Sequence, residues 1–314
     1  MNKILNTKII FICIICVAGL FSCKIETDDQ KQIKEDDARI NEYLVQNGID
    51  ATKDYRGFYY EKITENTNGQ SIDAGKVVAV TYRISTLEGS LLEDLIAKDS
   101  AVLLRHGTGN VLPVGIDYGI GLMRTKEKYR FYIPSNLAYY EYHNNDYFSS
   151  YTNFIVELTV DSVFSETDRF DMEEDSVESF IANNNISCEK LESGLYYSEV
   201  TDGTGDSPGN ANTVQIHFTR KTLGGKVIRT TTDGDPATFM IGAGAAVKGL
   251  EEGIKEMHEE GHAALFMTSK KGFGASLRII PSGLMNDLYD EGLIYTNVSP
   301  YEPLNYEVEL LDVY

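Results

Sequence analysis

The 314-residue sequence has no tryptophan and few basic residues, and both scarcities limit what the protein can bind. Its 48 Asp and Glu outnumber its 28 Lys and Arg, which gives a formal net charge of −20 at pH 7. Such a surface repels the phosphates of nucleic acids and anionic lipids, so we expect no nucleic-acid partner. Without tryptophan, an aromatic binding surface must come from the 20 Tyr and 13 Phe residues, which offer apolar faces and, in tyrosine, a hydroxyl.

The sequence also lacks an apolar run long enough to span a membrane. The apolar run at residues 9–21 follows Lys3 and Lys8 and is shorter than the roughly 20 residues that a membrane-spanning helix needs. Positive residues before a short apolar run are typical of a secretory signal peptide. The run ends in Leu20-Phe21-Ser22-Cys23, which resembles the bacterial lipobox, whose cysteine becomes lipidated.

We therefore expect a lipoprotein signal peptide at residues 1–22 and a lipidated Cys23, followed by a tether and the start of a helix at residues 23–38. This predicts a cell-envelope protein that is anchored to a membrane, in the outer membrane, on its periplasmic or its outer face. An ordinary signal peptide with an incidental cysteine is the alternative. Because Cys13 and Cys16 lie in the leader, only Cys188 would remain, which excludes an internal disulfide bond in the mature chain.

The rest of the sequence repeats itself. Gly-x-Tyr-Tyr occurs at Gly57 and Gly194, which are 137 residues apart, and both copies follow a polar helix pattern. Two alternating apolar patterns also recur, one at 78–82 and 214–218, the other at 154–160 and 306–310. The second of these has an offset of 152, so we expect about 16 extra residues late in the second unit.

Each unit predicts a small α+β domain. A short helix precedes several strands of period 2, a glycine-bounded apolar helix and a closing strand, with no regular alternation of strands and helices. This order favours a mostly antiparallel, curved β-sheet packed on a short α-helix. We place the two domains at residues 39–165 and 174–314, joined by an acidic linker at 166–173, with a long insertion near 274–299.

Several motifs occur in a fixed order in these units. They are Val80-Thr81-Tyr82, Ile133-Pro134-Ser135-Asn136-Leu137-Ala138-Tyr139, Ile216-His217-Phe218-Thr219, Phe239-Met240-Ile241-Gly242 with Val247-Lys248-Gly249-Leu250-Glu251-Glu252-Gly253, and Tyr306-Glu307-Val308-Glu309-Leu310-Leu311. Together they resemble the FKBP-type peptidyl-prolyl cis-trans isomerases, over both units and nearly the whole mature chain. The resemblance implies two tandem FKBP-like domains, each preceded by a helix.

The implied reaction needs no nucleophile, metal or cofactor, and we expect none. Rotation about an X-Pro bond is opposed by amide resonance, which places charge on the carbonyl oxygen. Moving the amide from water into a dry aromatic pocket favours the twisted, less polar state. The resemblance therefore predicts a folding helper that acts on proline-containing polypeptides of the cell envelope. The alternative is a binding module of the same fold, without catalysis, for an envelope protein or a surface ligand.

The resemblance also assigns site residues in each domain. In the first domain it implies Tyr82, Glu93 and Tyr139 as catalytic residues, and Leu92, Val111, Leu112, Ile116 and Phe154 as substrate-binding residues. In the second domain it implies Phe218, Ile228, Phe239, Val247, Leu250, Phe273, Val298 and Tyr306 as substrate-binding residues.

The second domain departs further from the family. Arg229 stands where the family has an acid, and Phe273 lacks the hydroxyl that Tyr139 keeps, so we expect activity, if any, in the first domain. Both domains lack the family's floor tryptophan and have Ile116 and Leu250 there. We expect the 274–299 insertion to form a flap over the second pocket, because loops of this length are usually functional.

One motif points elsewhere. His258-Glu259-Glu260-Gly261-His262 matches the zinc-protease pattern, which requires both histidines on one helical face. Because Gly261 is a typical helix end, we expect the histidines to lie on either side of a turn and to bind no metal.

Overall fold

The computed structural model describes residues 26–314. The expected signal peptide and Cys23 lie outside the described residues, as does the expected lipidation. No helix in the described part of the chain has the length and apolar character needed to cross a membrane.

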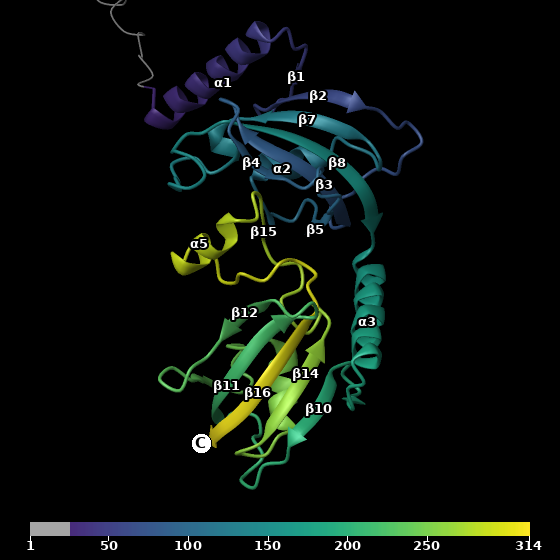
Figure 1. Cartoon of the computed structure of the whole chain (residues 1–314). Coiled ribbons are helices and arrows are strands. Elements are labelled where there is room, and N and C mark those ends of the chain that lie inside the picture. Colours follow the sequence, from purple (N-terminus) through teal and green to yellow (C-terminus); the bar gives the residue numbers. More distant parts are fainter. Residues whose placement is uncertain (1–25) are drawn as a thin grey trace, which may run out of the picture.

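The first domain is an antiparallel sheet with a short helix against one face and a long helix against the other (Figure 1). The sheet order is β1-β2-β7-β8-β3-β4, and β5 also pairs with β3. The elements are α1 (Asp28–Gln46), β1 (Thr52–Lys53), β2 (Tyr59–Thr64), β3 (Val77–Thr86), β4 (Leu91–Asp94), β5 (Val102–Arg105), β6 (Val111–Leu112), α2 (Val114–Ile120), β7 (Lys128–Ile133), the 3₁₀ turn η1 (Ser135–Leu137) and β8 (Phe154–Phe164).

The second domain repeats this arrangement with the sheet order β12-β11-β16-β14-β10-β9, and β13 also pairs with β11. The elements are α3 (Glu166–Asn183), β9 (Glu189–Lys190), β10 (Tyr196–Thr201), β11 (Thr213–Thr222), β12 (Val227–Thr230), β13 (Ala237–Met240), α4 (Lys248–Lys255), β14 (His262–Met267), β15 (Arg278–Ile279), α5 (Leu284–Asp290) and β16 (Leu304–Val313). The α+β class, the two tandem domains and the helix before each domain agree with the sequence analysis.

Period-2 burial and close helix packing build the core of each domain. In β3, Val78, Val80 and Tyr82 are fully buried, as the alternation predicts. The helix α2 packs on this face of the sheet at a glycine, since a Cβ on Gly119 would lie 2.6 Å from the ring of Phe131. At the equivalent place in the second domain, α4 carries Gly253.

The long helix before each domain docks through a buried carboxylate. In the first domain, Asp36 of α1 accepts hydrogen bonds from the Ser135 backbone N–H (3.1 Å) and hydroxyl (2.5 Å). In the second, Glu173 of α3 accepts them from the Ser269 N–H (2.6 Å) and hydroxyl (3.0 Å). Both carboxylates are completely buried, and burial raises the pKa of Glu173 to about 7. The repeat therefore includes the helix and its polar anchor.

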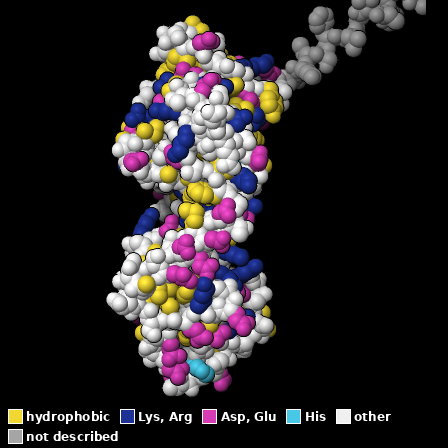
Figure 2. All heavy atoms as spheres, turned by 90° about the vertical axis from the view of Figure 1, so that its right-hand side faces the viewer, with side chains coloured by type: hydrophobic (Ala, Val, Ile, Leu, Met, Phe, Trp, Pro, Cys, Tyr) yellow, Lys and Arg dark blue, Asp and Glu magenta, His cyan; other side chains and the backbone are white. Residues whose placement is uncertain are grey.

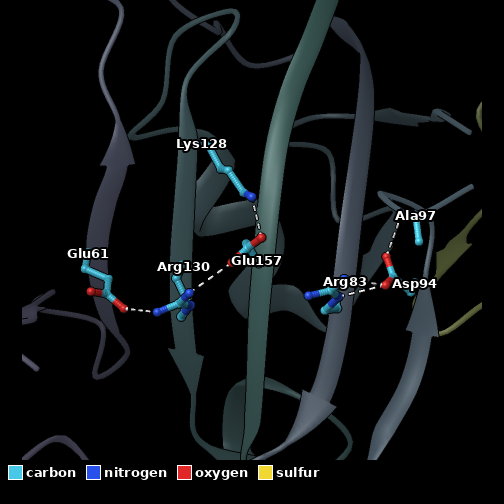
Figure 3. Close-up of polar contacts among 7 residues, drawn as sticks. All are labelled: Glu61, Arg83, Asp94, Ala97, Lys128, Arg130 and Glu157. Atoms are coloured by element: carbon cyan, nitrogen blue, oxygen red, sulfur yellow. Dashed lines mark hydrogen bonds and ion pairs between the residues drawn. The ribbon is translucent and has the colours of Figure 1, made fainter. Parts of the chain in front are cut away.

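A row of alternating charges crosses the other face of the first sheet (Figure 3). Directly paired positions on β2, β7, β8, β3 and β4 are, in order, Glu61, Arg130, Glu157, Arg83 and Asp94. Ion pairs join Arg130 to Glu61 (2.9 Å) and to Glu157 (3.0 Å), and Arg83 to Asp94 (2.6 Å). Each strand thus presents a charge opposite in sign to that of its neighbours.

Two expectations need correction. The stretch 166–173, expected as an acidic linker, forms the first part of α3, which begins near the junction of the two lobes and runs along the second (Figure 1). Acidic side chains gather on this side of the molecule (Figure 2). The repeat offset of the closing strands is 150, not 152, because Ile84 pairs with Val156 while its counterpart Arg220 pairs with Tyr306. Tyr306 therefore corresponds to Val156 rather than to Phe154.

Candidate functional site

The predicted site residues of the first domain come together at the end of the sheet near α2. Tyr82 projects from β3 and Glu93 lies on the neighbouring strand β4. Tyr139 follows the η1 turn, and its ring packs edge-on against Phe154 with the ring centroids 6.1 Å apart. The five predicted substrate-binding residues belong to the same core cluster, in which Val111, Ile116 and Phe154 are buried and Leu92 and Leu112 are partly buried.

This site is filled by the insertion of the second domain. Figure 1 shows β15 and α5 leaving the second domain and lying against the first. The strand β15 pairs in parallel with β6, placing Arg278 beside Val111 and Ile279 beside Leu112. The backbone N–H of Ile280 then donates to the carbonyl of Leu112 at 2.9 Å. The apolar residues Ile279, Ile280 and Leu284 are completely buried in the first domain's core cluster.

The three predicted catalytic residues all take part in holding this segment. The Tyr139 hydroxyl donates to the carbonyl oxygen of Ile280, the residue before Pro281, at 3.0 Å. Glu93 accepts hydrogen bonds from the Ser282 backbone N–H (2.8 Å) and hydroxyl (2.5 Å). The Tyr82 hydroxyl donates to the same carboxylate. The Ile280–Pro281 peptide bond is cis.

Both tyrosine hydroxyls act as donors because they stay protonated. Burial raises the pKa of Tyr139, and burial together with the charge of Glu93 raises the pKa of Tyr82. The site therefore offers one hydroxyl to a carbonyl oxygen and one carboxylate to N–H and O–H donors, inside apolar walls. This combination can bind an X-Pro peptide group and the residue that follows it.

The insertion, expected as a flap over the second pocket, contributes to both pockets. Residues 278–288 lie in the first domain, although Tyr289, Tyr295 and Thr296 do line the cavity of the second. The physical reason is that β6 has a free edge and Glu93 offers an acceptor for the segment. The segment's Ile279, Ile280 and Ser282 were missed as site residues, and the Ile-Pro-Ser sequence inside an apolar stretch was the available signal.

The second domain has an open cavity of about 880 Å³ at the equivalent place. Six of the eight predicted residues line it, namely Phe218, Phe239, Val247, Leu250, Phe273 and Tyr306. Ile228 and Val298 are not among its lining residues and instead contribute to the second core cluster. The second cavity is thus lined by aromatic side chains, and Ile228 and Val298 lie outside its lining.

The cavity of the second domain is positively charged. Its lining includes Arg220, Arg229, Lys248 and Lys270, and it includes no Asp or Glu. Arg220 is 5% exposed and stacks on Phe273, with its Cζ 4.7 Å from the ring centroid. Its Nη1 donates to the Tyr306 hydroxyl at 3.5 Å and its Nη2 to Oδ1 of Asn297 at 3.4 Å, whereas its buried Nε has no hydrogen-bond partner. The sequence analysis identified Arg229 but missed Arg220, which follows Phe218 by two residues on the same strand.

The two histidines lie on either side of a turn, as expected, although α4 ends at Lys255 rather than at Gly261. His258 lies in the turn after α4, with its Nδ1 2.9 Å from the Ser207 hydroxyl oxygen, and His262 is the first residue of β14. Within residues 26–314, no group of three or more His, Cys, Asp and Glu side chains has an arrangement suited to a metal ion.

Comparison with known proteins identifies the family. Residues 69–159 and 205–311 both match the model of the FKBP-type peptidyl-prolyl cis-trans isomerases. The two matches cover more than half of the chain, which therefore belongs to this family and contains two of its domains in tandem.

Similar proteins include the FK506-binding protein of Neisseria meningitidis serogroup B, which is 28% identical over 122 residues, covering 38% of this chain and 97% of that protein. The chloroplastic FKBP16-3 of Arabidopsis thaliana is 27% identical over 127 residues, covering 40% of this chain. The matched region spans about half of that plant protein, 52% of its length. Among solved structures, the three FKBP domains of wheat FKBP73 match 83% of this chain and 96% of that chain, with 14% identity and a TM-score of 0.34.

Proposed function

We propose that the protein is an exported, lipid-anchored peptidyl-prolyl cis-trans isomerase that assists the folding of proline-containing polypeptides of the cell envelope. The signal-peptide pattern and Cys23 support the location, and family membership supports the reaction. The observation that carries the proposal is the hydrogen bond from Tyr139 to the carbonyl of Ile280. The first pocket holds the group on which an isomerase acts, namely the amide of an X-Pro bond.

The chemistry follows from the surroundings of that amide. Rotation about the bond has a barrier of about 18–20 kcal/mol because resonance gives it double-bond character. The resonance form carries charge on the carbonyl oxygen, and water stabilises this charge. Ile116 and Phe154 are fully buried and supply dry walls in place of water, so the twisted, less polar amide is favoured. Every 1.4 kcal/mol removed from the barrier raises the rate about tenfold.

The polar groups position the substrate rather than react with it. The hydroxyl of Tyr139 fixes the carbonyl that precedes proline, and Glu93 fixes the residue that follows proline. These contacts hold the polypeptide with its X-Pro bond beside the apolar walls. Tyr82 orients the carboxylate of Glu93 and has no separate contact with the segment among the hydrogen bonds of the described residues.

One observation favours a second candidate function, that of a binding module without catalysis. The first pocket is already occupied by the chain's own residues, and the second cavity has Phe273 where the first has Tyr139. Under this reading, both domains would hold polypeptides without changing the rate of isomerisation.

Exchange NMR on an Ile-Pro-Ser peptide at millimolar concentration, with the full chain as catalyst, tests the proposal. We expect measurable catalysis, and a loss of about fivefold in Tyr139→Phe because one hydrogen bond contributes roughly 1 kcal/mol. Tyr314→Phe, at a residue of the second domain that is 67% exposed, is the control and should leave the rate unchanged. Equal rates for wild type and Tyr139→Phe would contradict the assignment of the first pocket. Labelling with a radioactive fatty acid, lost in Cys23→Ala, tests the anchor.

A further inference from the structure

The insertion of the second domain occupies the first pocket as a polypeptide ligand would. We infer that residues 276–288 are a resident ligand of the first pocket, which a client polypeptide must displace, and that the clients carry an apolar residue, proline and serine in sequence. This inference rests on the proposed function for the identity of the pocket.

The segment uses the groups that a substrate would use. Its backbone pairs with β6, the carbonyl before its proline accepts from Tyr139, and the residue after its proline binds Glu93 through both N–H and hydroxyl. A segment that only covered the domain could be buried without forming hydrogen bonds to β6, Tyr139 and Glu93. A client cannot form the same bonds while the segment is in place, so the two compete.

The same contacts define the class of client. Ile280 is completely buried, so the residue before proline is apolar. Glu93 accepts two hydrogen bonds from Ser282, so a hydroxyl side chain after proline gains a contact that alanine cannot make. Leu284 is also completely buried, which adds an apolar side chain three residues after the proline.

The segment is tethered at both ends close to the second domain. The Ser276 hydroxyl donates to the Val298 carbonyl at 2.7 Å, and the Tyr301 N–H donates to the Gly274 carbonyl at 2.9 Å. These bonds close the neck of the insertion, so residues 278–288 can leave the first pocket without unpairing the second sheet. A tethered ligand acts at an effective concentration of about millimolar. If the pocket is free about 1–10% of the time, the apparent affinity for a client falls about 10–100-fold.

The test uses the full chain and a fluorescent peptide with the sequence of residues 276–285. The double variant Ile280→Ser and Leu284→Ser weakens the binding of the resident segment and changes no residue of the first domain. We expect it to bind the peptide at least about tenfold more tightly than wild type, measured by fluorescence anisotropy. Leu293→Ser, in the same insertion at a residue that is 59% exposed, is the matched control and should bind like wild type. A peptide with Ser282→Ala should bind less tightly than the unchanged peptide.

The outcomes separate this inference from the proposed function. Tighter binding by the double variant without any catalysis would support the resident ligand and overturn the isomerase. Catalysis with unchanged binding would support the isomerase and overturn the resident ligand. Hydrogen exchange of residues 276–288 in the wild-type chain gives a second readout that needs no variant. Saturating peptide should increase this exchange, and an unchanged exchange would overturn the inference.

A second inference rests on different side chains. We propose that the cavity of the second domain binds a carboxylate attached to an apolar group. Arg220 and Arg229 lie directly opposite each other on β11 and β12, and like charges in this arrangement are unfavourable. No Asp or Glu among the described residues lies within 4.0 Å of either guanidinium in an ion pair, although the chain has 20 more acidic than basic residues.

Arg220 is buried, which makes its positive charge costly without an anionic partner. The Arg220 guanidinium donates only to two neutral groups, the Tyr306 hydroxyl and the Asn297 amide oxygen, and its buried Nε has no hydrogen bond, so this buried cation has no anionic partner among the described residues. The guanidinium fork matches a carboxylate, and Phe218, Phe239 and Phe273 supply an apolar wall beside it. In the first domain the corresponding pair is Ile84 and Glu93, so this positive charge belongs to the second domain alone.

Ligand-observed NMR with three small probes tests the cavity. N-acetylphenylalanine carries the carboxylate at a chain end, an acetyl-Glu-Phe amide carries it on a side chain, and N-acetylphenylalanine amide carries none. We expect at least one acid to bind about tenfold more tightly than the neutral amide, and the better acid identifies the source of the carboxylate. Equal binding of all three probes, or binding of none, would overturn the proposal.

Variants locate the binding in the cavity. Arg220→Met together with Arg229→Gln should abolish the preference for the acid, whereas Lys98→Gln, which removes one positive charge at an exposed residue of the first domain, should retain it. Arg229→Gln alone, at an exposed residue, should reduce the preference and gives a readout even where the buried variant fails to fold. A preference that persists in both arginine variants would overturn the assignment.

Discussion

The two domains share a sheet order, a helix packed at a glycine and a buried carboxylate anchor, yet their pockets have opposite chemistry. At one cross-strand pair, the first domain has Ile84 with Glu93 and the second has Arg220 with Arg229. After the docking serine, the first domain has Tyr139 and the second has Phe273. A few side chains, placed by strand register, therefore give each pocket its own binding chemistry, while the backbone fold of the two domains is the same.

The domains also differ in how they are completed. The first pocket is filled by residues from the second domain, whereas the second keeps a cavity of about 880 Å³. The insertion contributes to both, through Ile280 in the first pocket and Tyr289 and Tyr295 at the wall of the second. A single stretch of chain therefore supplies residues to both pockets.

The largest expected effect concerns Glu173, the buried carboxylate that anchors the long helix of the second domain. Burial raises the pKa of Glu173 to about 7 from an unfolded value of 4.5, so the folded chain binds more protons between these pH values. Its contribution to stability is present below pH 4.5 and is lost as the pH rises through about 7. Relative to Glu173→Gln, wild type should lose about 3 kcal/mol in free energy of unfolding between pH 4.5 and 8.

Urea unfolding followed by circular dichroism, for both chains across this pH range, measures the difference. Asp175→Asn, at an exposed residue of the same helix, is the control and should follow the wild-type curve. If Glu173→Gln shows the same pH dependence as wild type, the buried carboxylate is not its source.

A smaller difference between the domains is expected in the stability lost when the glycines that contact the sheets in α2 and α4 are replaced by alanine. A Cβ on Gly119 would lie 2.6 Å from the ring of Phe131, whereas one on Gly253 would lie 2.5 Å from the methyl groups of Leu265. A leucine methyl can rotate away more easily than a fully buried ring. Gly119→Ala should therefore destabilise the first domain by about 2 kcal/mol, and Gly253→Ala should destabilise the second by less than about 1 kcal/mol.

Hydrogen exchange resolved by mass spectrometry reads the two domains separately in the full chain. Each variant serves as the control for the other, because its effect should stay within its own domain. Equal destabilisation by the two substitutions would show that ring rigidity does not matter at this contact.

The smallest difference is expected in the stability contributed by Glu157 of the charge row and by its counterpart Glu307 in the second domain. Although burial opposes it, hydrogen bonds from Lys128 and Arg130 lower the pKa of Glu157, so its contribution is present above pH 4.5 and is lost as the pH falls through the lowered value. Its counterpart Glu307 is 54% exposed and pairs only with Lys221 among the ion pairs of the described residues. At neutral pH, Glu157→Gln should cost about 1 kcal/mol and Glu307→Gln only a few tenths.

Thermal unfolding at low and high salt checks this prediction. The effect of Glu157→Gln should shrink as salt screens the ion pairs, while that of Glu307→Gln stays near zero. A larger effect at Glu307 would reverse the expected order.

The sequence predicted the fold well because burial alternation and motif order are local properties. It also placed Tyr82, Glu93 and Tyr139 in one site, since the family resemblance fixes their positions on strands and turns. It missed the Ser282 contact because that residue is 189 positions from Glu93, and no local pattern reports a pairing between domains. It misaligned Phe154 with Tyr306 because a shift of two residues preserves an alternating apolar pattern.

During folding, too, a strand can pair with its neighbour in a register shifted by two residues. A strand that slips by two residues keeps its apolar side chains on the buried face, so burial alone rejects the wrong pairing only weakly. In the first sheet, such a slip of β3 against β8 would move Arg83 away from Glu157, its partner in the row. The alternating charges thus act as a check on strand alignment, which the second sheet, with Ala264 and Thr219 beside Glu307, does without.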